Sequence, residues 1–341
     1  MKNLTDDYIY LDTNTGKYVP KTLYRYIHPY WLTFNRLETA VPLSVAAAPA
    51  LAKPVNFFVQ NNSVAGEGEG FGTPLLAKYI VFADSTDTTA LSNVTVFMRN
   101  FNGRDYMNQP VHIRTLAGTA RLPAVLREPL FLESISSIST QFQKISGGAV
   151  NIWMYLAGKY FYPGSVSFKA PNSPLSSYMK AQMDYMRERE KYVHPFWLTT
   201  AAPDAPVVLT ASQTRQVDIK ISDTTLELYT IMAASTGNFA LEIQEVRTGQ
   251  TLMNGRITQT NSIGDATFPT KLPFSYKLPQ GARLRLTFQD LSAGTNTIFL
   301  TFQGRKIFAP IKDVPELDRI ADDYYRTAQN AFPMVAEPVG V

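Results

Sequence analysis

Two short stretches of this sequence, YIHPYWLT at residues 26–33 and YVHPFWLT at residues 192–199, are nearly the same. Six of their eight positions match, at a spacing of 166 residues. The two differences, Ile27 against Val193 and Tyr30 against Phe196, conserve apolar character. Repetition at a fixed spacing indicates that one structural unit occurs twice, so we expect the repeat to decide the fold.

Further matches follow at a spacing of 146 residues, without a gap, from Met107 onward. In pairs from the first and second copy they are Met107-Asn108 with Met253-Asn254, Leu126 with Leu272, Phe142-Gln143 with Phe288-Gln289, Ser146 with Ser292, Ile152 with Ile298, Trp153 with Phe299, and Gly158 with Gly304. The fall from 166 to 146 places twenty extra residues in the first copy. The Ala-, Pro- and Gly-rich stretch 46–72 has no evident counterpart in the second copy, so we expect a long loop or arm there.

The second copy shows the clearest secondary-structure pattern. In ARLRLTFQDL, the apolar residues Leu284, Leu286 and Phe288 alternate with Arg283, Arg285 and Thr287, which is typical of a half-buried antiparallel strand. Short strand-prone runs separated by turn residues are expected at 207–211, 217–221, 226–232, 239–246, 252–257, 274–278, 284–291 and 298–308. This pattern predicts a mainly β protein of two tandem antiparallel β-sandwiches, immunoglobulin-like or jelly-roll-like, and eight strands favour the jelly roll.

A helix is expected after each sandwich. Ser173 and Pro174 form a helix start before a run without Gly or Pro, and Asp313 and Glu316 surround Pro315 as an N-terminal capping pattern. The predicted organisation is a first sandwich at 1–172, including an N-terminal arm and the loop 46–72, a linker helix at 173–191, a second sandwich at 192–311, and a C-terminal helix and tail at 312–341.

Composition argues against several functional classes. The net charge is only +4 and there is no basic run, so no nucleic-acid partner is expected. The chain has no cysteine, which excludes disulfides, thiolate metal sites and cysteine nucleophiles. No signal peptide is apparent, and the longest apolar stretch, 40–52, is too short to span a bilayer, so we expect a cytosol-like compartment and no membrane.

No catalytic, cofactor-binding or metal-binding residue is predicted. His28 and His194 occupy the same place in the two copies, and duplicated positions are more simply explained as scaffold than as catalysis. His112 lies alone in a strand-like run, where a structural role is also expected. The run GEGEGFG at 66–72 lacks the Lys-Ser/Thr ending of a phosphate-binding loop. The structural repeat motif therefore consists of His28, Pro29, Trp31, His194, Pro195, Trp197, Gly158 and Gly304.

Two features resemble bacteriophage virion structural proteins of the minor head, decoration or tail type. One is LPAVLREPLFLES…STQFQKISG at 122–147, echoed at 268–294, and the other is the pair of closing strands NIWMYLAGKYFYP and TIFLTFQGRKIFAP. The resemblance lies in the general pattern of prolines, strands and turns over half of the chain and not in a specific motif. No functional residue is carried over from it. It implies a component of a virion that has no catalytic activity.

The first hypothesis is therefore a non-enzymatic structural protein of a virus or phage particle: a capsid, capsid decoration, collar or tail component, made in the host cytoplasm. Its partners would be other copies of itself and other virion proteins. Candidate arms lie at 1–21, 46–72 and 332–341, and candidate assembly contacts are Tyr178, Met179, Met183, Tyr324, Tyr325 and Phe332. The alternative is a carbohydrate- or receptor-binding sandwich on a fibre or surface, with a glycan as ligand; an enzyme is the third possibility.

Overall fold

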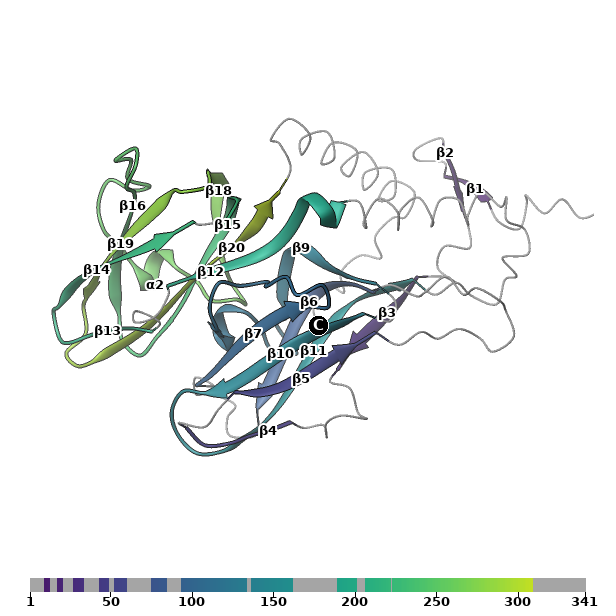
Figure 1. Ribbon diagram of the computed structural model, residues 1–341, viewed down its shortest axis with the longest axis horizontal. Helices are drawn as coiled ribbons and strands as arrows, with labels where there is room; N and C mark the ends of the chain where they lie inside the picture. Colours follow the sequence, from purple (N-terminus) through teal and green to yellow (C-terminus); the bar gives the residue numbers. More distant parts are fainter. Residues whose placement is uncertain are drawn as a thin grey trace, which may run out of the picture.

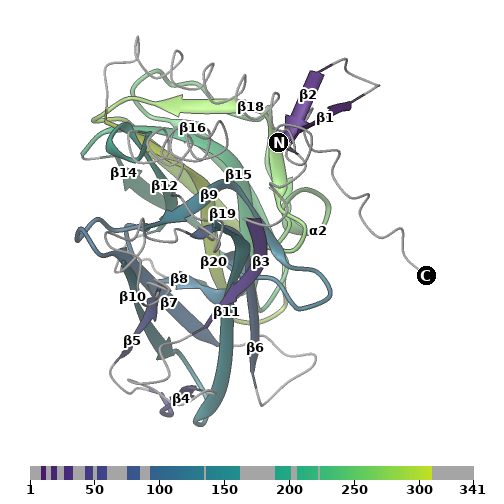
Figure 2. The same cartoon turned by 90° about the vertical axis from the view of Figure 1, so that its right-hand side faces the viewer.

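The computed structural model describes residues 9–12, 17–20, 27–33, 43–48, 52–59, 75–84, 93–133, 136–161, 189–200, 206–221 and 223–308. These residues are mainly β strands, and most of them build two groups of sheets that lie side by side (Figures 1 and 2). A separate hairpin is formed by β1 (Ile9–Asp12) and β2 (Lys17–Pro20). No helix in the described part of the chain has the length and apolar character needed to span a membrane.

The first group, called here the first sandwich, consists of nine strands in two antiparallel sheets. The strands are β3 (Ile27–Leu32), β4 (Leu43–Val45), β5 (Lys53–Phe58), β6 (Leu75–Asp84), β7 (Val94–Asn100), β8 (Val111–His112), β9 (Ala124–Leu132), β10 (Ser137–Lys144) and β11 (Val150–Phe161). One sheet has the order β3-β11-β6-β9, with β4 also paired to β11, and the other has the order β5-β10-β7-β8.

The second sandwich repeats this arrangement strand for strand. Its strands are β12 (Val193–Thr199), β13 (Val207–Leu209), β14 (Thr214–Lys220), β15 (Thr225–Ser235), β16 (Phe239–Glu245), β17 (Ile257–Thr258), β18 (Thr270–Leu278), β19 (Arg283–Asp290) and β20 (Asn296–Ile307). The sheet orders are β12-β20-β15-β18, with β13 also on β20, and β14-β19-β16-β17. β3 and β4 both pair with β11, and β12 and β13 both pair with β20. If each of these pairs is counted as one interrupted strand, each sandwich has eight strands in two sheets, as a jelly roll has.

The repeat extends to the register of single residues. Trp31 is paired with Ala157, and Trp197, 166 residues later, is paired with Gln303, 146 residues after Ala157. The bulges also repeat: β6 skips one residue opposite Ala157/Gly158, and β15 skips one opposite Gln303/Gly304. A Cβ at Gly158 or Gly304 would lie 2.0 Å from the carbonyl oxygen of Leu76 or Glu227, respectively. The two matched glycines are therefore required by the close approach of a bulged strand.

The extra residues of the first copy are not all in the predicted loop. Equivalent residues differ by 162 at β5 and β14 (Phe58 and Lys220), by 151 at β6 and β15 (Ile80 and Ile231), and by 145 at β7 and β16 (Val94 and Phe239). Most of the surplus thus lies between β5 and β6, but part lies between β6 and β7. The prediction of one loop over 46–72 was wrong for Lys53–Phe58, which forms β5 and has β14 as its counterpart. That strand was missed because an Ala- and Pro-rich stretch precedes its short apolar alternation and Pro54 lies within it.

Each sandwich encloses a core of apolar side chains from both of its sheets. The predicted alternation in β19 is confirmed, since Leu284, Leu286 and Phe288 are fully buried. All eight predicted runs of the second copy overlap a strand, although the run 252–257 contributes only the first residue of β17. The sequence YVHPFWLT, which was not included among these runs, contains the whole of strand β12.

The predicted helices lie largely outside the described residues. Only the end of the linker helix is described, where residues 189–192 are helical, and the C-terminal helix from 312 onward falls wholly outside. The structure therefore gives no support for a helix after each sandwich, and the domain boundaries stay a prediction. The candidate assembly contacts, Tyr178, Met179, Met183, Tyr324, Tyr325 and Phe332, also lie outside the described residues.

Candidate functional site: the joint between the two sandwiches

A short segment of the first sandwich adds to the free edge of a sheet in the second. Trp197, in the edge strand β12, donates its backbone N–H to the carbonyl of Tyr106 at 2.8 Å, and Asn108 donates to the carbonyl of Trp197 at 3.4 Å. Met107 and Trp197 form a parallel bridge. The contact of 104–128 with β12, β15 and β20, called here the joint, therefore includes backbone pairing between the two sandwiches.

The side chain of Asn108 extends this pairing by one residue. Its amide nitrogen donates to the carbonyl of Thr199 at 2.7 Å, and its amide oxygen accepts from the N–H of Thr199 at 2.8 Å. An asparagine amide carries one donor and one acceptor group, so it can satisfy both backbone groups of a residue. Asn108 thereby pairs the end of an edge strand that would otherwise be left open.

Apolar burial across the joint joins the two cores. Trp197 is 1% exposed and packs in the core of the first sandwich, next to Met107, together with Met232 of β15 and Ala266. Trp197, part of the predicted repeat motif, thus packs in the core of the other sandwich. Strand β15 is buried at every position from Leu226 to Ala234, so it has lost the alternation of a one-sided strand. At β15 the sheet is therefore covered on both faces.

His194 and His112 are buried at the joint. The ring of His194 stacks on Tyr106, with 4.6 Å between centroids and 17° between planes, and burial, aided by Arg104 and Lys306, lowers its pKa to about 3. The ring of His112 lies 4.4 Å from that of Phe299 in β20. Its Nδ1 accepts from the N–H of Arg114 at the start of the 3₁₀ turn η2 (Ile113–Thr115). Burial, and then Arg114, lowers the pKa of His112 to about 3, so both rings are neutral at pH 7.

His28 does not meet His194. His28 pairs with Tyr160 in β11, whereas His194 pairs with Lys306 in β20, so the two histidines occupy equivalent positions in different sheets. The predicted motif residues His28, Pro29 and Trp31 lie in β3, and their side chains are outside the described part of the structure. Their counterparts His194, Pro195 and Trp197 lie in β12 and are buried.

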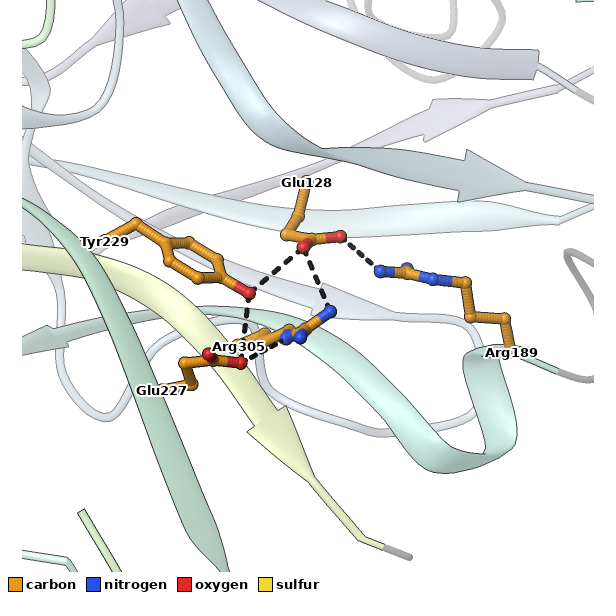
Figure 3. A network of polar contacts seen from close by, with 5 residues as sticks. All are labelled: Glu128, Arg189, Glu227, Tyr229 and Arg305. Atoms are coloured by element: carbon orange, nitrogen blue, oxygen red, sulfur yellow. Dashed lines mark hydrogen bonds and ion pairs between the residues drawn. The ribbon is translucent and has the colours of Figure 1, made fainter. Parts of the chain in front are cut away.

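A network of charged side chains closes another part of the joint (Figure 3). Glu128 of β9 accepts from Arg189 at 2.6 Å and from Arg305 of β20 at 3.4 Å, and Arg305 also donates to Glu227 of β15 at 2.8 Å. Tyr229, the bulged residue of β15, donates to Glu128 at 3.1 Å. Two carboxylates face two guanidinium groups, and none of these four side chains is more than 15% exposed.

Each carboxylate of the network is paired with an arginine. Burial acts to raise the pKa of Glu227, but a hydrogen bond with Ser275 and the charge of Arg305 outweigh it, so the pKa is lowered and the carboxylate stays ionised. Burial and then Glu128 raise the pKa of Tyr229, which keeps its hydroxyl protonated as a donor. Because the charges satisfy one another, the arrangement fixes the relative position of β9, β15 and β20. Among the described residues, no three His, Asp or Glu side chains gather as metal ligands do.

The network was missed in the sequence because its two carboxylates are not duplicated. Glu128 and Glu227 correspond by register to the apolar Phe274 and Leu76, whereas Arg305 corresponds to a second basic residue, Lys159. A search for residues shared by both copies passes over the two glutamates. The useful signal was the opposite one: a carboxylate in one copy at a place where the other copy is apolar. By contrast, Met107-Asn108 did stand out through its match with Met253-Asn254, although nothing in the sequence revealed its role.

No protein-family model matches the chain, and no curated protein matches it by sequence. Among solved structures, the chain is similar to the major capsid protein P2 from bacteriophage PM2, with 9% identity, a TM-score of 0.39, and coverage of 83% of this chain and 99% of that one. It is also similar to the VP2 subviral particle of infectious bursal disease virus, with 11% identity, a TM-score of 0.16 and coverage of 83% and 72%. A third is the tandem CBM22 domain from Paenibacillus barcinonensis Xyn10C, with 10% identity, a TM-score of 0.18 and coverage of 82% and 97%. Likenesses at these TM-scores carry no argument about function.

Proposed function

We propose that this chain is a non-enzymatic structural protein of a virus or phage particle, and that it acts as a rigid building block made of two jelly rolls. The observation that carries the proposal is the sheet of β12, β15 and β20, which is buried on both faces. One face covers its own core and the other covers the first sandwich, so the two jelly rolls are held in one arrangement. A repeating shell needs subunits of fixed shape, because small errors of angle accumulate over many copies.

The placement of buried polar groups supports the same proposal. Glu128, Glu227, Arg305 and the two histidines are engaged in holding the two sandwiches together. Charged residues make up 18% of the chain, below the roughly 25% of an ordinary soluble domain. Jelly rolls are found in viral capsids and in lectins, so the fold alone does not decide between these two roles. Finding many copies of the chain in one particle would decide in favour of the structural role.

The proposal is tested by finding the chain in particles. Particles are purified on a density gradient from a culture that expresses the chain naturally, and their proteins are quantified by mass spectrometry. We expect the chain to co-sediment with the particles at many copies each. The proposal is rejected if particles form while the chain stays in the soluble fractions.

A glycan-binding role is the second candidate, and one observation favours it. Tyr79, Trp153 and Tyr155, on the outer face of the first sandwich, are only partly buried, and such rings can stack on sugars. A glycan array probed with the purified chain separates the two roles. Binding that is lost in a Trp153→Ala variant would favour the glycan role, and silence of the array would remove it.

A further inference from the structure

The first sandwich carries its own version of the sheet face that the joint covers. By register, Tyr79, Val81 and Ala83 in β6 correspond to Thr230, Met232 and Ala234 in β15. The three residues of β15 are at most 5% exposed, whereas Tyr79 and Val81 are partly exposed and Ala83 is exposed. Trp153 and Tyr155 of β11 lie on the same face and are also partly exposed. This face is apolar and aromatic, and it is open where its counterpart is closed.

The edge of that sheet is open in the same way. Strand β3 stands at the end of its sheet, as β12 does, but within the described ranges only β11 pairs with it. Thr33 directly follows β3 and is the counterpart of Thr199, whose backbone groups are bonded by Asn108. The buried hydroxyl of Thr33 has no hydrogen-bond partner among the described residues. The equivalent hydroxyl of Thr199 bonds within its own sheet, to the carbonyl of Leu300, so it is the open backbone edge of β3 beside an apolar face that marks a pairing site.

The second sandwich carries its own version of the segment that fills such an edge. Residues 251–254 correspond to 105–108 and have the same backbone bonds: Leu252 donates to Ile243 at 2.9 Å, as Tyr106 donates to Met98 at 3.0 Å. The bridges Gln244–Thr251 and Arg99–Asp105 also correspond. Met107 is fully buried in the joint, whereas Met253 is only partly buried and Asn254 is exposed. Leu252 and Met253 pack partly against the core of the second sandwich, but among the described residues Met253 has no bridge like that of Met107 with Trp197.

Two exposed aromatic residues of the second sandwich lie at positions equivalent to 122 and 128 of the first. Phe268 and Phe274 are 67% and 75% exposed, and they correspond to Leu122 and Glu128 on the joint side of the first sandwich. Where the joint has the ion network, the second copy thus has an apolar side chain. Large exposed apolar side chains mark contact surfaces.

We propose that the segment Leu252–Asn254 of one copy of this chain pairs with the outer edge of β3 in a second copy, in the way that Tyr106–Asn108 pairs with β12 inside each chain. The side chain of Asn254 then bonds both backbone groups of Thr33, and Thr258, the counterpart of His112, lies over Trp153, the counterpart of Phe299. Phe274, the counterpart of Glu128, then lies near Leu76, the counterpart of Glu227. The contact is heterologous, because each copy offers a segment at one end and an edge at the other. It rests on the proposed structural function and names its partner, a second copy.

Photo-crosslinking tests the pairing directly. A benzophenone amino acid replaces Met253, unlabelled and ¹⁵N-labelled full-length chains are mixed at high concentration and irradiated, and tryptic peptides are identified by mass spectrometry. Trypsin cleaves after Arg25 and Arg36, so β3 lies in one peptide, 26–36. We expect mixed-isotope crosslinks from position 253 to peptide 26–36. The same group at Val208, an exposed position in β13, should not crosslink to that peptide.

Crosslinks only within one chain, only to other peptides, or none at all would overturn the pairing. This failure is distinct from that of the proposed function: a chain that is abundant in particles but crosslinks elsewhere keeps its structural role and loses this contact. The particle fractionation is read independently of the crosslinks.

Association measured by sedimentation gives a second test. Asn254→Leu removes the proposed bonds to Thr33 at an exposed position, so the chain should fold with an unchanged melting temperature. We expect its self-association to weaken at least tenfold, since two hydrogen bonds are lost at the edge of the contact. Met253→Asp should weaken it further, and Val208→Asp serves as the charge-matched control. Equal association of all three variants and the parent chain would contradict the proposal.

Discussion

The outer faces of two equivalent sheets differ in whether another part of the molecule covers them. In the second sandwich, the face of β12, β20 and β15 is closed by the joint, and every residue of β12 is buried. In the first sandwich, β6 is the counterpart of β15, which is buried from Leu226 to Ala234. From Tyr79 to Ala83, β6 alternates between buried residues and residues that are partly or fully exposed. Since the backbone register is the same in both, the difference arises from side chains and from position in the chain. Duplication gives each sandwich one pairing segment (106–108 or 252–254) and one edge strand (β3 or β12). Within one chain, the first segment pairs with β12, so the second segment and β3 are left over.

The largest effect that separates the two copies is expected at the matched methionines. Met107→Ala should lower the free energy of unfolding by about 3 kcal/mol, because the side chain is fully buried where the two cores meet. Met253→Ala should cost about 1 kcal/mol or less in dilute solution, where Met253 is only partly buried. Denaturant unfolding of both variants measures the difference. Equal losses would mean that the joint contributes nothing beyond the packing of each sandwich.

A smaller difference is expected at Glu128 and its counterpart Phe274. Glu128→Ala leaves Arg189 and Arg305 without a carboxylate that both contact, and we expect a loss of about 2 kcal/mol because these side chains are nearly buried. Phe274→Ala should change the stability by less than about 0.5 kcal/mol, since Phe274 is 75% exposed. Thermal unfolding of the two variants at low concentration checks this. A Phe274→Ala variant as unstable as Glu128→Ala would show that Phe274 is buried in the monomer.

Much of the fold could be predicted from the sequence, because period-two alternation and turn residues are local signals. Leu284, Leu286 and Phe288 are buried as expected, and the repeat placed Gly158 and Gly304 at equivalent positions. Strand β5 was missed, since a short run containing a proline within an Ala- and Pro-rich stretch resembles a loop. Its pairing with β10 depends on residues far away in the chain, which no local pattern reports.

The joint could not be predicted for a different reason. Matching residues between copies finds what both sandwiches share, and Met107-Asn108 was found in this way. The contact itself links non-equivalent places, such as Asn108 with Thr199 and Thr115 with Thr301. Only the three-dimensional placement of one sandwich against the other brings these residues together. A charge present in one copy and absent from the other, as at Glu128, is the sequence feature that points to such a contact.

The smallest expected effect concerns pH and is confined to the joint, since the counterpart of His112 in the second copy is Thr258. Burial, and then Arg114, lowers the pKa of His112 to about 3 in the folded chain, whereas an unfolded histidine titrates near 6.5. Between these values the unfolded chain binds the extra proton, so the stability contributed by neutral His112 is lost as the pH falls. The expected loss from pH 7 to pH 6 is about 0.7 kcal/mol. Glu190, whose pKa is raised to about 7 by burial and then Glu133, acts in the opposite direction, because its protonation stabilises the folded chain.

The contribution of His112 is therefore isolated by comparison with His112→Asn. Asparagine does not titrate, and its amide oxygen can replace Nδ1 as acceptor for the N–H of Arg114. Glu190 and His194 act equally in both chains, so the difference in stability between parent and variant should shrink by about 0.7 kcal/mol when the pH is lowered from 7 to 6. Urea unfolding at the two pH values measures that difference. If the difference in stability is the same at both pH values, His112 binds protons equally in the folded and unfolded chain. The joint would then not shield the His112 ring from water.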